Sequence, residues 1–172
     1  MNFSYHEIRN QIHDGDLIAV KGTGIFSEIT EFVTSSKYSH TGIAVWLGGG
    51  LWVSQMTSGG NNLVPLSQFK SFDVYKCPVV NQRVRKYVLE TLRSKVEYAF
   101  ADLVIAGLDF LTSFKLPPTH TGLICSAAST EAYMACGWGV AYTKATGNML
   151  DAPPVPTPAW IASKLELKYM VG

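Results

Sequence analysis

Charged side chains are scarce in this chain of 172 residues. Asp, Glu, Lys and Arg make up 16% of it, and 14 basic residues against 13 acidic ones leave a net charge of +1. Nucleic-acid-binding domains concentrate Lys and Arg, so this balance excludes nucleic acid as an expected partner. An apolar fraction of 47% excludes a disordered chain. We therefore expect one globular domain that spans residues 1–172.

Cysteines and long apolar runs are also few. The three cysteines form no Cys-x-x-Cys pair, so we expect reduced surroundings rather than a disulfide framework. The longest apolar segment, residues 98–114, contains two aspartates and is shorter than the roughly 20 residues of a membrane span. The first residues include several charged ones and no apolar stretch of the kind found in a signal peptide. These absences predict a cytoplasmic protein without an integral membrane segment, or one exported by a route that leaves no signal.

Hydrophobic periodicity indicates strands in the first half of the chain and helices in the second. The pattern favours strands over residues 16–20, 40–47, 51–56 and 72–77, with turns at 48–50 and 59–62. It favours helices over residues 4–12, 26–33, 80–96, 102–111 and 125–136. Thr157 and Pro158 fit the N-cap and first turn of a last short helix. This order predicts an α+β domain.

Cys125 stands where a strand-like run, TGLI, gives way to a helical pattern of small residues. Unpaired N–H groups and the helix dipole stabilise a thiolate at the start of a helix. The thiolate is the nucleophilic form of cysteine, so a histidine within reach would make the chain a cysteine hydrolase or acyltransferase. The best candidate partner is His40, which opens the strand over 40–47. The alternatives are a cysteine that packs as a small core hydrophobe and a half-buried histidine bound to a turn carbonyl.

Four segments carry a resemblance to a known family: 15–20 (GDLIAV), 22–24 (GTG), 38–43 (YSHTGI) and 125–126 (CS). Together they resemble the circularly permuted branch of the NlpC superfamily of papain-like cysteine hydrolases. That branch includes bacterial and poxviral hydrolase-like proteins and the relatives of lecithin:retinol acyltransferase. Its histidine strand precedes its cysteine helix, which is the order found here, and the resemblance covers about residues 14–165.

The resemblance implies a permuted papain-like fold in which an antiparallel sheet packs against the helix that carries Cys125. It implies that Cys125 is the nucleophile, that His40 is the general base, and that a third polar residue orients the imidazole. Relatives often have Glu at that third position, on the strand after the histidine. The matching residue here is Gln55, which stabilises an imidazolium less than a carboxylate does; Ser54 faces the other way. The family's Tyr before the cysteine is Ile124, so the backbone N–H of Cys125 is left for the oxyanion.

The expected function is thiol hydrolysis of amide bonds in peptidoglycan-type or other small peptides, through an acyl-enzyme. One alternative is an acyltransferase or thioesterase that acts on lipid-like acyl groups. Another is a catalytically degenerate member of the fold that binds a peptide or lipid. We expect a peptide or acyl small-molecule substrate, no cofactor and no metal site, because His40, His120, Cys125 and Cys136 lack the spacing of zinc ligands. His120 is expected in a loop that could line the same cleft, while Cys77 and Cys136 are expected to be structural.

Overall fold

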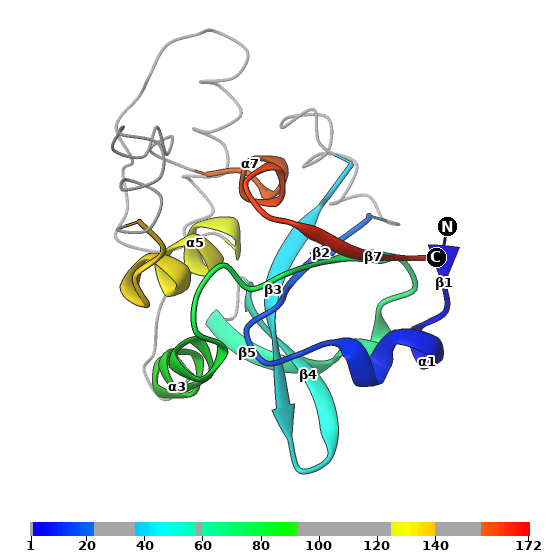
Figure 1. Ribbon diagram of the computed structural model, residues 1–172, viewed down its shortest axis with the longest axis horizontal. Coiled ribbons are helices and arrows are strands. Elements are labelled where there is room, and N and C mark those ends of the chain that lie inside the picture. The colour runs from blue at the N-terminus through cyan, green and yellow to red at the C-terminus, as the bar shows by residue number, and fades with distance from the viewer. Residues whose placement is uncertain (1, 23–36, 58–59, 93–124, 140–155) are drawn as a thin grey trace, which may run out of the picture.

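The chain folds around one seven-stranded sheet with helices on both faces, which makes it an α+β protein (Figure 1). The computed structural model describes residues 2–22, 37–57, 60–92, 125–139 and 156–172. The strand order is β1-β7-β6-β2-β3-β4-β5, and β2 and β3 therefore lie near the middle of the sheet. All neighbouring pairs are antiparallel except β1 and β7, which are parallel.

The strands are short, with two to eight residues each. Their bounds are β1 Asn2–Phe3, β2 Leu17–Val20, β3 His40–Leu47, β4 Gly50–Thr57, β5 Gly60–Pro65, β6 Phe72–Tyr75 and β7 Leu167–Val171. The longest two, β3 and β4, form a hairpin through Gly48 and Gly49, whose positive φ angles of 58° and 76° suit glycine. The predicted strands over residues 16–20, 40–47, 51–56 and 72–77 are confirmed within a few residues.

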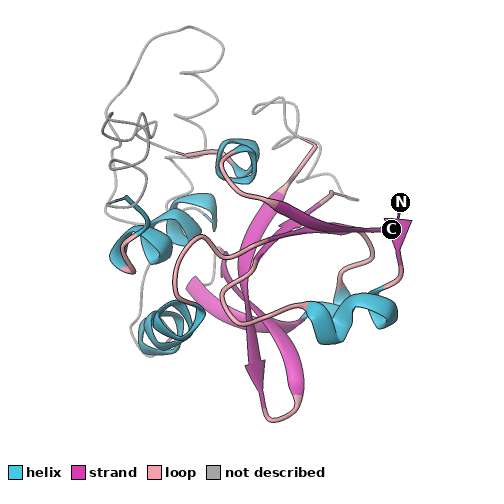
Figure 2. Ribbon diagram, viewed as in Figure 1, coloured by secondary structure: helices cyan, strands magenta, loops and turns pink. Residues whose placement is uncertain are grey.

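The helices supply the layers above and below the sheet. They are α1 Tyr5–Ile8, α3 Asn81–Thr91, α5 Cys125–Ala135 and α7 Pro158–Ser163, with 3-10 turns η1 Arg9–Gln11 and η2 Leu66–Gln68. Thr157 is the N-cap of α7 and accepts a hydrogen bond from the Trp160 N–H at 3.2 Å, as its sequence position predicts. The secondary-structure view in Figure 2 shows α3 and α5 as neighbours.

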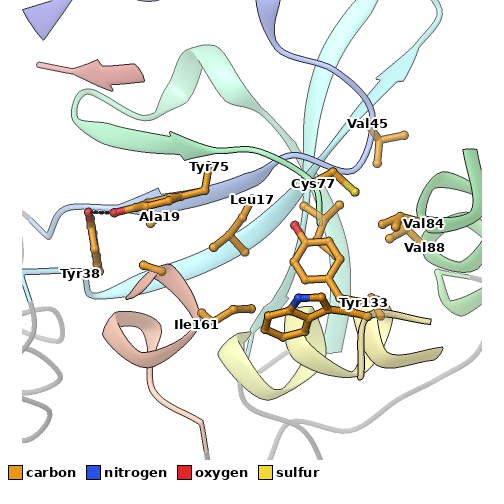
Figure 3. Close-up of a cluster of buried hydrophobic side chains, with 14 residues drawn as sticks. Leu17, Ala19, Tyr38, Val45, Tyr75, Cys77, Val84, Val88, Tyr133 and Ile161 are labelled. Carbon is orange, nitrogen blue, oxygen red and sulfur yellow. Dashed lines mark hydrogen bonds between the residues drawn. The ribbon is translucent and has the colours of Figure 1, made fainter. Parts of the chain in front are cut away.

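Two buried clusters lie on opposite faces of the sheet. One joins the sheet to α3, α5 and α7, and Figure 3 shows Tyr133 of α5 reaching in toward Leu17 and Cys77. The Tyr133 hydroxyl donates to the Gly15 carbonyl at 2.8 Å and so ties the middle of α5 to the chain just before β2. The other cluster packs α1 and η1 against the far face through Ile8 and Ile12. The cysteine helix is therefore held by core packing.

Several expectations about the strands were wrong. The turn predicted at 59–62 is in large part strand β5, whose Asn61 and Asn62 pair with Met56 and Gln55 of β4. The terminal strands β1 and β7 were not predicted at all. Both are short, and β7 lacks a clear apolar alternation, so periodicity gives little signal there. The helices predicted over 26–33 and 102–111 lie outside the described residues.

Candidate active site

His40 is the first residue of β3 and is paired across the sheet with Val20 of β2. The residues just before His40 are held by contacts with Asp73 of β6, whose carboxylate is fully buried. Tyr38 donates its hydroxyl to Asp73 Oδ2 at 2.5 Å, and Lys37 Nζ lies 3.0 Å from the same oxygen. Lys21 Nζ lies 2.6 Å from Asp73 Oδ1. The entry into β3 is therefore anchored by a buried charge cluster, which limits how far His40 can shift.

Burial alone would raise the pKa of the Asp73 carboxyl, because a buried charge loses its water. The hydrogen bonds from Lys21, Tyr38 and Lys37 outweigh that effect, and the pKa of Asp73 is lowered overall. Asp73 is therefore a charged structural residue at neutral pH.

Cys125 is the first residue of α5 and only 7% of it is exposed. The first turn of the helix is fixed at two points. The hydroxyl of Ser126 donates to the Pro156 carbonyl at 2.5 Å. Ser129 donates its hydroxyl to the Cys125 carbonyl at 3.1 Å and lies 3.5 Å from the Thr41 hydroxyl on β3. The helix start and the strand start therefore meet, as the pairing of Cys125 with His40 requires.

The Cys125 thiol and the His40 imidazole interact through charge and through a hydrogen bond between their side chains. Burial raises the pKa of Cys125, but the charge of His40, its hydrogen bond and the backbone N–H groups of Thr41 and Ser126 lower it to about 7. For His40, burial lowers the pKa, while Cys125 and then Gln55 raise it, and the pKa is raised overall. Each residue thus favours the charged form of the other, which is the electrostatic condition for a thiolate–imidazolium pair.

Gln55 lies beside His40, as the sequence predicts. The register pairs Gly42 with Gln55 across β3 and β4, so His40, two residues before Gly42, is the diagonal neighbour of Gln55. The Gln55 side chain raises the pKa of His40 through a hydrogen bond. Nε2 of His40 is buried and has no aligned hydrogen-bond partner among the described residues. The Gln55 amide therefore lies next to the imidazole, but it is not aligned for a hydrogen bond with Nε2. Its position is consistent with the orienting role expected for it.

Gly42 is the residue that lets the two strands approach at this point. A Cβ atom at position 42 would lie 2.4 Å from Val53 Cγ1 and 2.7 Å from the Ser54 carbonyl oxygen. Both distances are below any ordinary contact, and the second neighbour is backbone, which cannot rotate away. The glycine in the YSHTGI segment is thus required by the spacing that brings Gln55 next to His40.

A cavity of about 60 Å³ adjoins Cys125. It lies between α5, α3 and the β4–β5 hairpin, and Gln55 forms part of its wall. Ser54, which the sequence analysis placed facing away from His40, also lines it and donates to Asn61 Oδ1 at 3.1 Å. A substrate group bound there would lie next to the sulfur.

The other two cysteines have thiols whose pKa is raised, which favours the protonated form. Burial raises the pKa of Cys77 to about 11, and its thiol donates to the Val79 carbonyl at 3.4 Å. Burial also raises the pKa of Cys136, which nearby Arg83 lowers only in part. Cys125 is therefore the one thiol of the three whose pKa is lowered. His120 lies outside the described residues, so its predicted place in a loop near the cleft stays a prediction.

Three residues near the pair, Thr41, Ser126 and Ser129, were not named as site residues from the sequence. The backbone N–H groups of Thr41 and Ser126 lie at the sulfur, and the hydroxyls of Thr41 and Ser129 approach one another between strand and helix. Thr41 and Ser126 each follow a predicted site residue, so adjacency was the only available signal. Ser129 could have been found as the residue one helical turn after Cys125.

No protein-family model matches this chain, and no curated protein matches it either. Five chains of solved structures match it, among them the crystal structure of metalloprotein yiiX from Escherichia coli O157:H7, DUF1105, with a TM-score of 0.62. The sequences are 16% identical, and the match covers 93% of this chain and 98% of that one. At this identity the likeness concerns the fold alone.

The name of that neighbour raises the question of a metal here. Within the described ranges, no three His, Cys, Asp or Glu side chains gather as they would to hold a metal ion. Cys125 and His40 face each other without a third such ligand in that part of the chain. In the same ranges, every helix is too short or too polar to cross a membrane.

Proposed function

We propose that this protein is a thiol hydrolase of amide bonds with a permuted papain-like fold, in which Cys125 attacks the carbonyl and His40 transfers the protons. The observation that carries the proposal is the coupled pair itself. The pKa of the Cys125 thiol is lowered to about 7 although burial opposes ionisation, and His40 is the main cause. The order of the residues, with the His40 strand before the Cys125 helix, supports the permuted arrangement.

The reaction begins with the proton of Cys125 on His40. The thiolate attacks the carbonyl carbon, a C–S bond forms, and the carbonyl electron pair moves onto oxygen. Collapse of this tetrahedral species breaks the C–N bond, and the His40 imidazolium gives its proton to the leaving amine. Water then attacks the acyl-enzyme while His40 accepts its proton. The carboxylic acid leaves and the thiolate returns.

The neighbours of the pair have separate tasks in this scheme. The N–H groups of Thr41 and Ser126 stabilise negative charge on sulfur before attack. Gln55 holds the ring in one orientation, and its alignment can improve when substrate closes the site, since catalytic hydrogen bonds are often loose without it. The thiol-linked acyl group is shared by hydrolysis and acyl transfer. We propose hydrolysis because the YSHTGI and CS segments resemble papain-like cysteine hydrolases, and this resemblance favours a small peptide amide as the substrate.

A turnover assay with a Cys125 variant tests the proposal. We expect the protein to hydrolyse activated esters or anilides of short N-acylated amino acids, and we expect Cys125→Ala to abolish this turnover. Cys136→Ala is the matched control, because Cys136 lies on the same segment but has a raised pKa. It should retain the wild-type rate. Equal turnover in wild type and Cys125→Ala would refute the proposal.

A further inference from the structure

The cavity beside Cys125 is lined by apolar side chains, here called its floor, and by polar side chains, here called its rim. The floor is formed by Ile43, Met56, Val88 and Ala132. The rim carries seven polar side chains from β4, β5, α3 and α5: Ser54, Gln55, Asn61, Tyr87, Thr91, Ser129 and Glu131. The chemistry of the rim depends on which of its hydrogen-bond donors and acceptors are already engaged.

The hydroxyl protons of the rim are all engaged with protein acceptors. Ser54 donates to Asn61 Oδ1 at 3.1 Å, and Thr91 donates to the Val88 carbonyl at 2.9 Å. Tyr87 donates to Glu131 Oε1 at 3.0 Å. Because each hydroxyl has one proton and two lone pairs, these groups can offer a ligand acceptors but not donors. The hydroxyls of Ser54 and Tyr87 therefore suit a ligand that brings N–H bonds of its own, while Thr91 already accepts from Asn61 Nδ2 at 3.5 Å. The amides of Gln55 and Asn61 are the N–H donors among the described lining residues.

The charge of the cavity also favours a cationic ligand. Glu131 is the one formally charged side chain among the described residues that line it, and no Lys or Arg is among them. Its carboxylate keeps an oxygen beyond the one that Tyr87 binds. Burial and the charge of Glu131 raise the pKa of Tyr87 to about 12, so the phenol stays protonated at neutral pH. A cation would gain attraction to this carboxylate, and an anion would meet repulsion from it.

We propose that this cavity is a subsite for a primary ammonium group carried by the substrate within a few bonds of the carbonyl that Cys125 attacks. An ammonium has three donors and no acceptor, which matches the acceptors of the rim, and its short carbon stem would contact the apolar floor. The small volume, about 60 Å³, limits the group to a few heavy atoms. The inference rests on the proposed function, because it takes Cys125 as the attacking group.

Size-matched thiol reagents of different charge test this subsite without knowledge of the substrate. Aminoethyl, hydroxyethyl and sulfonatoethyl methanethiosulfonate carry a positive, neutral and negative group. In each case the Cys125 thiolate attacks the sulfenyl sulfur, a mixed disulfide forms and methanesulfinate leaves. Peptide-resolved mass spectrometry gives the rate at Cys125. Each rate is divided by the rate of that reagent with N-acetylcysteine amide, which removes intrinsic reactivity.

We expect the normalised ratio of aminoethyl to sulfonatoethyl rates to exceed one at Cys125 and to fall about five-fold in Glu131→Gln. An exposed ion pair is worth about 0.2–1 kcal/mol, and the ratio counts both lost attraction and lost repulsion. Glu90→Gln is the matched control. It removes the same charge from α3, but Glu90 does not line this cavity. Its ratio should equal that of the wild type.

A wild-type ratio of one or below, or an equal fall in Glu131→Gln and Glu90→Gln, would overturn the subsite. The absolute rate at Cys125 reports on the reactivity that the proposed function needs. The ratio compares reagents on the same thiol and does not depend on that rate. If Cys125 reacts slowly but its ratio depends on Glu131, the hydrolase is refuted and the subsite is supported. If Cys125 reacts fast but shows no charge preference, the subsite is refuted and the hydrolase is supported.

Discussion

Replacing His40 by alanine should raise the pKa of the Cys125 thiol and slow its alkylation below neutral pH. His40 lowers that pKa by its charge and by a hydrogen bond, against the effect of burial. Without the imidazole, burial remains, and two backbone N–H groups are left to favour the thiolate. The Cys125 pKa should therefore move from about 7 to at least the ordinary cysteine value of about 8.5.

The expected loss of rate follows from the thiolate fraction and the nucleophilicity of the thiolate. At pH 6.5 about a quarter of a thiol with a pKa of about 7 is ionised, against about 1% at a pKa of about 8.5. The less acidic thiol gives a more nucleophilic thiolate. With a Brønsted coefficient of about 0.45, each thiolate of the variant reacts about five-fold faster, which offsets part of the loss in thiolate fraction. The net prediction is alkylation about five-fold slower in His40→Ala, and slower still if burial raises the pKa further.

The assay is iodoacetamide labelling between pH 5 and 9, followed at each cysteine by peptide mass spectrometry. Cys125 should react before Cys77 and Cys136 in the wild type near pH 6, and its midpoint should shift upward in His40→Ala. His6→Ala removes an exposed histidine from α1 and is the matched control, with no shift expected. If the midpoint of Cys125 is the same in wild type and His40→Ala, the electrostatic pairing is refuted.

Three further predictions concern the support of the pair. In turnover assays Gln55→Ala should lower the rate but leave more activity than His40→Ala, and Gln55→Glu should keep or raise it, because a carboxylate stabilises the imidazolium better; an unchanged rate in Gln55→Ala would assign the orienting role elsewhere. Gly42→Ala should lower the free energy of unfolding by about 2 kcal/mol through overpacking, as measured by urea denaturation, and an unaltered midpoint would contradict the close approach of the strands. Asp73→Asn should cost about 3 kcal/mol at pH 7, because Lys21 loses its buried partner. Since the pKa of Asp73 is lowered, its stabilising contribution is present above about pH 4 and is lost as the pH falls through the lower folded value. The difference from wild type in urea denaturation should therefore shrink in acid, and a constant difference would rule out the charge as its cause.

The strands that build the site could be predicted because each is bounded by a turn residue and rich in β-branched or aromatic side chains. The strand over 40–47 is found with the same bounds, and the helix predicted over 125–136 is found as α5 over Cys125–Ala135. The start of α7 was also predictable, since Thr157 and Pro158 have a local conformational preference that tertiary contacts did not override.

Other features depend on partners that are distant in the sequence. β5 was taken for a turn because Gly60, Asn61 and Asn62 favour turns locally, yet pairing with β4 makes them a strand. The Asp73 cluster joins β6 to Lys21, Lys37 and Tyr38, and no spacing rule relates these positions. The same holds for the cavity rim, where Tyr87 and Glu131 come from different helices. Cys125 and His40 were candidates from their local sequence, and the family resemblance favoured them as a pair over a core cysteine and a turn-bound histidine.

The most direct test of the central claim is the detection of an acyl group on Cys125 during turnover. The protein would be mixed with p-nitrophenyl acetate, quenched in acid within the first turnover and digested for peptide mass spectrometry. We expect one acetyl group, as a thioester on Cys125, which appears with a burst of p-nitrophenol and decays when the ester is consumed. The thioester should form much more slowly in His40→Ala. An acetyl group found on other residues only, or equal acetylation of Cys125 in both proteins, would contradict the claim that Cys125 and His40 act together.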